Sequence, residues 1–185
     1  MKNTFLIICF LLNITFCFGQ KNKEIWTENE KYQYSVLTNL VNYLYGKKTL
    51  EISHETLFNK YIYFDYVLND TLKNRIDDRL SKFDTIFSFF KTTFDSIGVS
   101  NFEAKPVRFY KQHKIYKPFD ERNAKQSISG EKMYTKDQNV FAYYRKDEPE
   151  NPLGVLLFDP NTNKLASWIM IQQGSYNYFL QFNLL

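Results

Sequence analysis

Residues 71–98 read TLKNRIDDRLSKFDTIFSFFKTTFDSIG and carry the strongest periodic pattern in the chain. Apolar side chains recur here at steps of three and four residues, which places them on one face of an α-helix. This apolar stripe consists of Leu72, Ile76, Leu80, Phe83, Phe87, Phe90, Phe94 and Ile97. Asp70 or Thr71 can cap the start, and Gly98 can close the end. The pattern predicts one long helix over about residues 71–97, roughly 40 Å in length.

The four phenylalanines of the stripe have three possible uses. They can pack against a sheet of the same chain, line a groove for lipid, or pair two chains as a coiled coil. Packing within the chain is the most frequent use of such a stripe, and it is our prediction.

Two helices are expected before this one. Thr27 and Glu30 have the spacing of a capping box, and the apolar pattern that follows predicts a helix over about residues 28–45. Gly46 then stands where a left-handed residue commonly ends a helix. Ser53 can cap a short second helix, although residues 61–68 are aromatic and β-branched enough for a strand. We favour the short helix.

Strand patterns follow Gly98. They cover Val107–Tyr116, Asn139–Arg145, Gly154–Phe158, Leu165–Ile171 and Tyr176–Asn183, with a polar loop over 118–131. Residues 159–164, DPNTNK, predict a hairpin turn and match only the first half of a calcium loop. Helices first and strands last indicate an α+β fold, with N-terminal helices packed on a C-terminal antiparallel meander sheet.

This order of elements, over about residues 24–183, resembles the NTF2-like and cystatin-like folds. In those folds a curved sheet wraps around a helix. The resemblance rests on element order and on no motif, so it implies no functional residues for this chain. One difference is that those folds place a strand between the early helices, where only 61–68 could supply it.

The first nineteen residues have the three parts of a secretory signal peptide. Lys2 provides the positive start, and an uncharged apolar run extends from Thr4 to Phe18. Cys17 and Gly19 are small residues at −3 and −1 of a cut that would leave Gln20 as the first residue. A lipoprotein signal or an uncleaved anchor fits less well, because Phe16 is bulky and the run is short for a membrane span. We expect a secreted or periplasmic protein of bacterial type.

Removal of residues 1–19 would also remove both cysteines of the chain, Cys9 and Cys17. The mature protein would then have no disulfide and would depend on its core alone. Its length predicts one α+β domain over residues 20–185.

Positive charge is concentrated in residues 103–125. This basic segment contains Lys105, Arg108, Lys111, Lys114, Lys117, Arg122 and Lys125, against Glu103, Asp120 and Glu121. The net charge of the whole chain, +4, is too small to indicate nucleic-acid binding. A patch for anionic lipid or polysaccharide is one interpretation of the segment, and a solvated surface is the simpler one.

No established catalytic or cofactor motif occurs in the sequence. The two histidines, His54 and His113, are far apart and lack neighbours at metal-ligand spacing. There is no Gly-x-Ser-x-Gly elbow and no glycine-rich phosphate loop. We therefore predict no cofactor, no metal site and no catalytic residues.

One group of residues suits a pocket, should the sheet curl around one. Arg108, Tyr110 and His113 come from one predicted strand, and Tyr144 and Trp168 come from later strands. A cation among aromatic rings would suit a small anionic or sugar ligand. The alternative is that these rings fill the interface between helix and sheet.

The sequence as a whole favours an exported, non-catalytic binding or interaction module of the cell envelope or extracellular space. Two alternatives stay open: a small enzyme or ligand-binding protein with an NTF2-like pocket, and an inhibitor or immunity-type protein. The expected partner is a protein or a small ligand, with no nucleic acid and no membrane span after signal cleavage.

Overall fold

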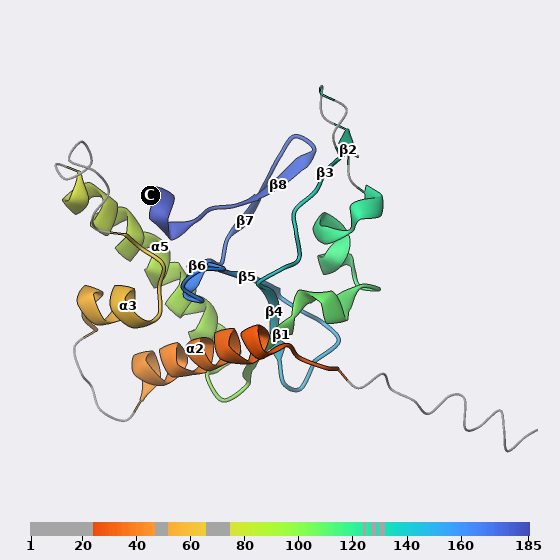
Figure 1. The fold of residues 1–185 in the computed structure, drawn as a ribbon. Coiled ribbons are helices and arrows are strands. Elements are labelled where there is room, and N and C mark those ends of the chain that lie inside the picture. Colours follow the sequence, from red (N-terminus) through yellow and green to blue (C-terminus); the bar gives the residue numbers. More distant parts are fainter. Residues whose placement is uncertain (1–23, 47–51, 66–74, 124, 127–128, 130–131) are drawn as a thin grey trace, which may run out of the picture.

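The structure is a computed structural model that describes residues 24–46, 52–65, 75–123, 125–126, 129 and 132–185. The α-helices precede the strands along the chain, and Figure 1 shows these α-helices grouped on one side of the sheet. The predicted α+β architecture is therefore confirmed.

A four-stranded antiparallel sheet lies at the centre, in the order β1-β4-β5-β6. Its strands are β1 (Phe102–Pro106), β4 (Val140–Arg145), β5 (Gly154–Phe158) and β6 (Leu165–Ser167). Strands β4, β5 and β6 form the predicted meander, and β1 joins its far edge beside β4. The turn between β5 and β6 is the predicted one, since the Asp159 carboxylate accepts the amide N–H groups of Asn161 and Thr162.

The helices α2 (Glu28–Tyr45), α3 (His54–Lys60) and α5 (Ile76–Ile97) share one apolar core with the sheet. From α5 the predicted phenylalanines Phe83, Phe87, Phe90 and Phe94 are buried in this core, and Gly98 ends the helix at φ 83°. Sheet residues such as Phe141 and Leu156 meet them from the opposite side. The stripe thus packs within the chain, while residues 71–74 and the predicted caps at 70–71 lie outside the described residues.

Helix α2 has the predicted bounds and the predicted capping box of Thr27 and Glu30. Its end differs from the prediction, because Gly46 is extended (φ −65°, ψ 157°) rather than left-handed. Space is the reason for glycine here: a Cβ on Gly46 would lie 2.5 Å from the carbonyl oxygen of Asn42.

The favoured short helix is present as α3, capped by Ser53. The chain then turns, and Ile62 makes a single parallel bridge to Leu165. No strand is formed over the described residues 61–65, and the rest of the predicted alternative strand lies outside them.

The predicted strand Val107–Tyr116 is wrong. This segment forms two 3-10 helices, η1 (Val107–Tyr110) and η2 (Lys114–Phe119), followed by η3 (Glu121–Asn123). The buried residues explain the error, because Val107 and Tyr110, like Tyr116 and Phe119, are three positions apart and face one side of a 3-10 turn. Together they cover the second face of the sheet, against Val140, Ala142 and Val155.

The last two predicted strands are also shorter than expected. Leu165–Ile171 is split between β6 and β7 (Met170–Gln173), and Tyr176–Asn183 ends as β8 (Tyr176–Phe179) followed by η4 (Phe182–Leu184). The break lies just after buried Ser167, whose hydroxyl contacts the carbonyl oxygens of Ile169 (3.1 Å) and Leu180 (2.6 Å), while the Leu180 N–H donates to the Ile169 carbonyl at 3.0 Å. Strands β7 and β8 therefore form a separate hairpin that projects from the sheet (Figure 1).

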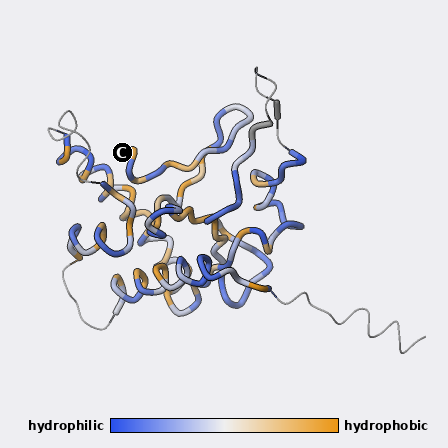
Figure 2. The backbone as a smooth tube through the Cα atoms, viewed as in Figure 1, coloured by the Kyte–Doolittle hydropathy of each residue, from blue (hydrophilic) through white to orange (hydrophobic). Residues whose placement is uncertain are grey.

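Figure 2 shows hydrophobic residues gathered where helices and sheet meet, whereas the outer end of the β7–β8 hairpin is hydrophilic. Two short strands, β2 (Lys125–Gln126) and β3 (Lys132–Met133), form a third small sheet. None of the helices in the described part of the chain has the length and apolarity needed to cross a bilayer.

Candidate functional site

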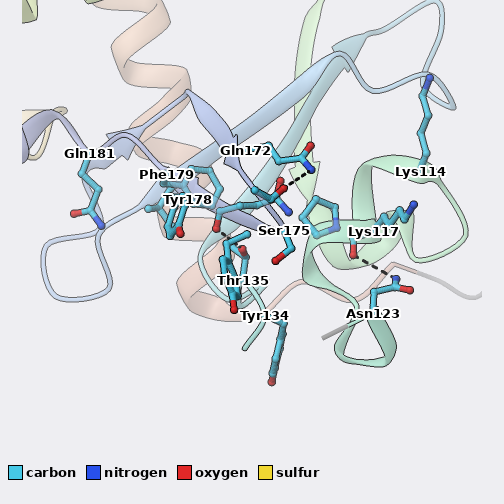
Figure 3. Close-up of a pocket in the computed structure, with 15 residues that line it drawn as sticks. Lys114, Lys117, Asn123, Tyr134, Thr135, Gln172, Ser175, Tyr178, Phe179 and Gln181 are labelled. Atoms are coloured by element: carbon cyan, nitrogen blue, oxygen red, sulfur yellow. Dashed lines mark hydrogen bonds between the residues drawn. The ribbon is translucent and has the colours of Figure 1, made fainter. Parts of the chain in front are cut away.

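A groove of about 720 Å³ lies between the β7–β8 hairpin and the segment around η2 and β3 (Figure 3). Its volume falls within the range of small-ligand sites. The lining residues are Lys114, Lys117, Pro118, Asn123, Tyr134, Thr135, Leu157, Gln172, Gly174, Ser175, Tyr176, Asn177, Tyr178, Phe179 and Gln181.

The walls of the groove come from chain segments far apart in sequence. On one side, η2 places Lys114 and Lys117 on the outside, because Tyr116 and Phe119 are turned into the core of the second sheet face. On the other side stands the hairpin, which is tied across the groove by the Thr135 hydroxyl donating to the carbonyl oxygen of Asn177 at 3.0 Å.

The groove lining mixes polar and apolar side chains and carries positive charge. Lys114 and Lys117 are exposed on its rim, and within the described residues neither ammonium group is in an ion pair. No carboxylate belongs to the described lining. Two carboxylates adjoining the lining segments in sequence are engaged: Asp120 pairs with Arg122 at 2.6 Å, and Asp137 accepts the Tyr116 hydroxyl at 2.6 Å.

Three of the five predicted site residues come together beside a different part of the second face. The Tyr110 ring lies 6.1 Å from the ring of His113 and 6.3 Å from that of Tyr144. Burial comes first among the causes that raise the pKa of Tyr144 to about 12, and nearby Glu103 adds to it. Tyr110 is buried and donates its hydroxyl to the Pro149 carbonyl, while His113 caps η2 by accepting the Ile115 N–H. These contacts are structural.

Arg108, the fourth predicted residue, is close by but engaged in a salt bridge. Its Nε and Nη2 atoms donate to the two Glu30 oxygens at 2.6 and 2.7 Å. Burial opposes ionisation of Glu30, but the bonds from Arg108 and Thr27 outweigh it and lower the pKa of the carboxyl group. Arg108 thus fastens η1 to the start of α2.

Trp168, the fifth, lies on the opposite face of the sheet. Its ring contacts Phe90 of α5 at 5.3 Å between centroids, in the helix-facing core. The structure therefore does not bring Trp168 together with the other four residues, and the alternative of a ring filling the helix–sheet interface holds for it.

A second, smaller cavity of about 340 Å³ lies at the edge of β1. It is lined by Trp26, Tyr34, Glu103, Ala104 and Tyr144. Of the predicted residues only Tyr144 belongs to this lining, because Tyr110 is packed behind it and Arg108 is turned toward Glu30.

Within the part of the chain that the structure describes, no three His, Cys, Asp or Glu side chains gather as metal ligands would. His54 contacts the Asp84 carboxylate at 2.6 Å and stacks on Phe58. His54 lines neither cavity, and His113, which also lines neither, caps η2 through its Nδ1 atom.

The groove was not predicted, although its parts carried signals. Lys114 and Lys117 belong to the basic segment, and Tyr176 and Tyr178 belong to the strict alternation at the end of the chain. Their meeting depends on the 3-10 conformation of 114–119 and on the break at Ser167, neither of which the sequence pattern revealed.

Comparison of the chain with protein-family models, with curated proteins and with solved structures finds no match. The function therefore has to be argued from the geometry.

Proposed function

We propose that the chain is an exported, non-catalytic binding module whose groove between η2 and the β7–β8 hairpin takes an acidic oligosaccharide. One observation carries the proposal: two exposed lysines without ion-pair partners among the described residues border a groove whose described lining has no carboxylate. Lysine ammonium groups on flexible stems attract anionic groups as mobile point charges.

Aromatic side chains make up the second part of the argument. Tyr134 and Tyr178 are 40% and 42% exposed, so part of each ring is accessible to a ligand. The ring centroids of Tyr176 and Tyr178 lie 6.4 Å apart on the hairpin. A sugar ring has one apolar C–H face, and an exposed tyrosine offers a matching flat apolar surface with a polar tip.

Amide and hydroxyl groups complete the match to a carbohydrate. Gln172, Gln181 and Asn123 present side-chain amides to the groove, and Ser175 adds a hydroxyl (Figure 3). Each amide both donates and accepts hydrogen bonds, as sugar hydroxyls do. A lipid tail would require an apolar lining instead, and the lining here is mixed.

We favour binding over catalysis because the described groove lining holds no histidine and no carboxylate, the groups that most often act as general acids and bases. Export is proposed from residues 1–19 alone. It agrees with the way the fold starts: Glu24, four positions after the expected first residue Gln20, is already paired with Lys105 at 2.8 Å. Mass spectrometry of the exported protein tests the start at Gln20.

The experiment is calorimetric titration of residues 20–185 with trigalacturonate, maltotriose and sodium sulfate. We expect trigalacturonate to bind and maltotriose to bind at least about tenfold more weakly. Sodium sulfate, added at the same concentration of negative charge, should not displace trigalacturonate. The double variant Lys114→Gln/Lys117→Gln should lose most of the affinity, and Tyr178→Ala should reduce it by about fivefold to tenfold.

The matched control is Lys111→Gln, which removes an exposed lysine of the same segment outside the groove lining. It should bind like the unaltered protein. Equal binding of the acidic and neutral sugars would overturn the role of charge, and binding of neither would overturn the groove proposal. Shortened sugar in the mixture would show an enzyme instead.

A further inference from the structure

We propose that the smaller cavity at the edge of β1 is a second site, which binds the alkylammonium group of a small organic cation. Its lining consists of three aromatic rings and one carboxylate, from Trp26, Tyr34, Tyr144 and Glu103, above Ala104. Aromatic rings around a carboxylate are the surroundings in which a cation is held by ring faces and by charge together. This inference is independent of the groove.

The rings are held in place by the fold. Trp26 lies edge-on to Tyr34, with 5.2 Å between centroids and 81° between planes, and it also packs on Phe109 and Phe141. Tyr144 is directly opposite Glu103 in the ladder between β1 and β4. Because these rings are already ordered by packing, a ligand pays little entropy to organise them.

Glu103 supplies the negative charge. Its Oε1 atom accepts the Tyr34 hydroxyl and the Ala104 N–H, whereas no donor among the described residues contacts Oε2. Burial and the contact with Glu103 raise the pKa of Tyr34, so its hydroxyl stays a donor. One carboxylate oxygen is therefore left to receive a ligand N–H or to face a quaternary ammonium group.

The cations of the protein near this cavity are already neutralised. Lys105 pairs with Glu24 at 2.8 Å, and Arg108 pairs with Glu30 at 2.6 Å. Glu103 is the carboxylate that remains, so the local balance is one negative charge. The Lys105 ammonium lies 5.7 Å from the ring centroid of Tyr144, a lining ring, and closer, at 4.6 Å, to that of Tyr110 outside the lining.

Size limits the ligand to a small group. A cavity of about 340 Å³ is at the lower end of the range for small-ligand sites, which fits a choline-sized head group better than an oligosaccharide. The alkylammonium group can belong to a free small molecule or to a lysine side chain of another protein, and the experiment separates the two.

The test is an NMR titration that follows the two indole N–H signals, from Trp26 and Trp168, in residues 20–185. The probes are choline, N-acetyl-lysine methylamide and 3,3-dimethylbutan-1-ol, the neutral isostere of choline. We expect choline or the lysine derivative to move the Trp26 signal in a saturable way, with the neutral isostere about tenfold weaker or more. The tighter of the two cations identifies the source.

Two variants keep the test decisive. Glu103→Gln retains an acceptor for Tyr34 and removes the charge, and Tyr144→Leu removes one ring face; each should weaken binding by about fivefold or more. Glu148→Gln removes an exposed carboxylate that is not part of the cavity lining and should change nothing. Equal binding of the neutral isostere, or an unmoved Trp26 signal, would overturn the proposal whatever the groove binds.

Discussion

Arg79 is the one arginine on the phenylalanine-rich face of α5 within the described residues, and it is only 3% exposed. Its guanidinium group donates to the carbonyl oxygens of Asp65 (3.0 Å) and Asn183 (3.1 Å) and to the main-chain oxygen of Leu185 (3.2 Å). It also lies 4.5 Å from the ring centroid of Phe64. Burial lowers its pKa, yet an arginine stays charged in proteins. One buried cation thus joins three segments of the chain.

Replacing Arg79 by methionine should lower the free energy of unfolding by about 3 kcal/mol, because three oxygens lose a charged donor in a buried place. Arg79→Lys should recover only part of this loss, since an ammonium group lacks the planar fork that reaches several acceptors. Urea denaturation measures both. Arg75→Met, at the exposed start of the same helix, is the control, and an equal loss there would contradict the argument.

Strands β4 and β5 pair a large residue with a small one at one position. Gly154 lies opposite Tyr143 in the ladder, and the tyrosine ring lies over the glycine. A Cβ on Gly154 would come within 2.6 Å of two ring carbons and 2.4 Å of the hydroxyl oxygen. Tyr143 is itself buried and stacked on Phe102, so its ring has little room to retreat.

Gly154→Ala should therefore destabilise the protein by about 1–3 kcal/mol, as overpacking commonly does. A double-mutant cycle shows whether the Tyr143 ring is the cause. In a Tyr143→Leu background, Gly154→Ala should lower the free energy of unfolding by less than half as much. Thermal or urea unfolding of the four proteins gives the double-mutant cycle. Additive losses would show that the backbone, and not the Tyr143 ring, requires glycine.

For the whole molecule, the sequence predicted those elements whose periodic pattern extends over many residues or begins at a clear cap. Helix α5 has five buried stripe positions at helical spacing, and the Thr27 capping box marked the start of α2. Segment 107–119 was not predictable in the same way. Its buried residues are few and three apart, and this spacing resembles loose alternation until tertiary contacts such as Tyr110 with Pro149 are known.

The same limit applies to the candidate sites. Sequence could assign Lys114 and Lys117 to a basic segment, but not place them opposite a hairpin that begins after the chain leaves the sheet near Ser167. Gln33 illustrates the point inside the core: its amide N–H₂ group donates to the side chains of Asn139 and Asn163, more than a hundred residues away. Pairings over such distances leave no periodic pattern.

Several tyrosines spread over the whole fold share one electrostatic property. Burial first, and then neighbouring carboxylates or hydrogen bonds, raise the pKa values of Tyr34, Tyr45, Tyr110, Tyr116 and Tyr144. In the folded state these phenols keep their protons above pH 10, the ordinary pKa of tyrosine, whereas in the unfolded chain they release them. Since the unfolded state then binds fewer protons, its stability relative to the folded state increases with pH.

We therefore expect the free energy of unfolding to be unaffected by these groups below about pH 9 and to fall as the pH rises through 10 toward 12. Urea denaturation between pH 8 and about pH 11.5 measures the slope. Tyr110→Phe and Tyr116→Phe, which remove buried hydroxyls bonded to the Pro149 carbonyl and to Asp137, should each make the fall shallower, by up to about 1.4 kcal/mol per pH unit. Tyr32→Phe, at an exposed position, controls for the loss of a tyrosine. If the two buried variants kept the full slope, these hydroxyls would have to ionise freely in the folded protein, and the packing of the second sheet face around them would be wrong.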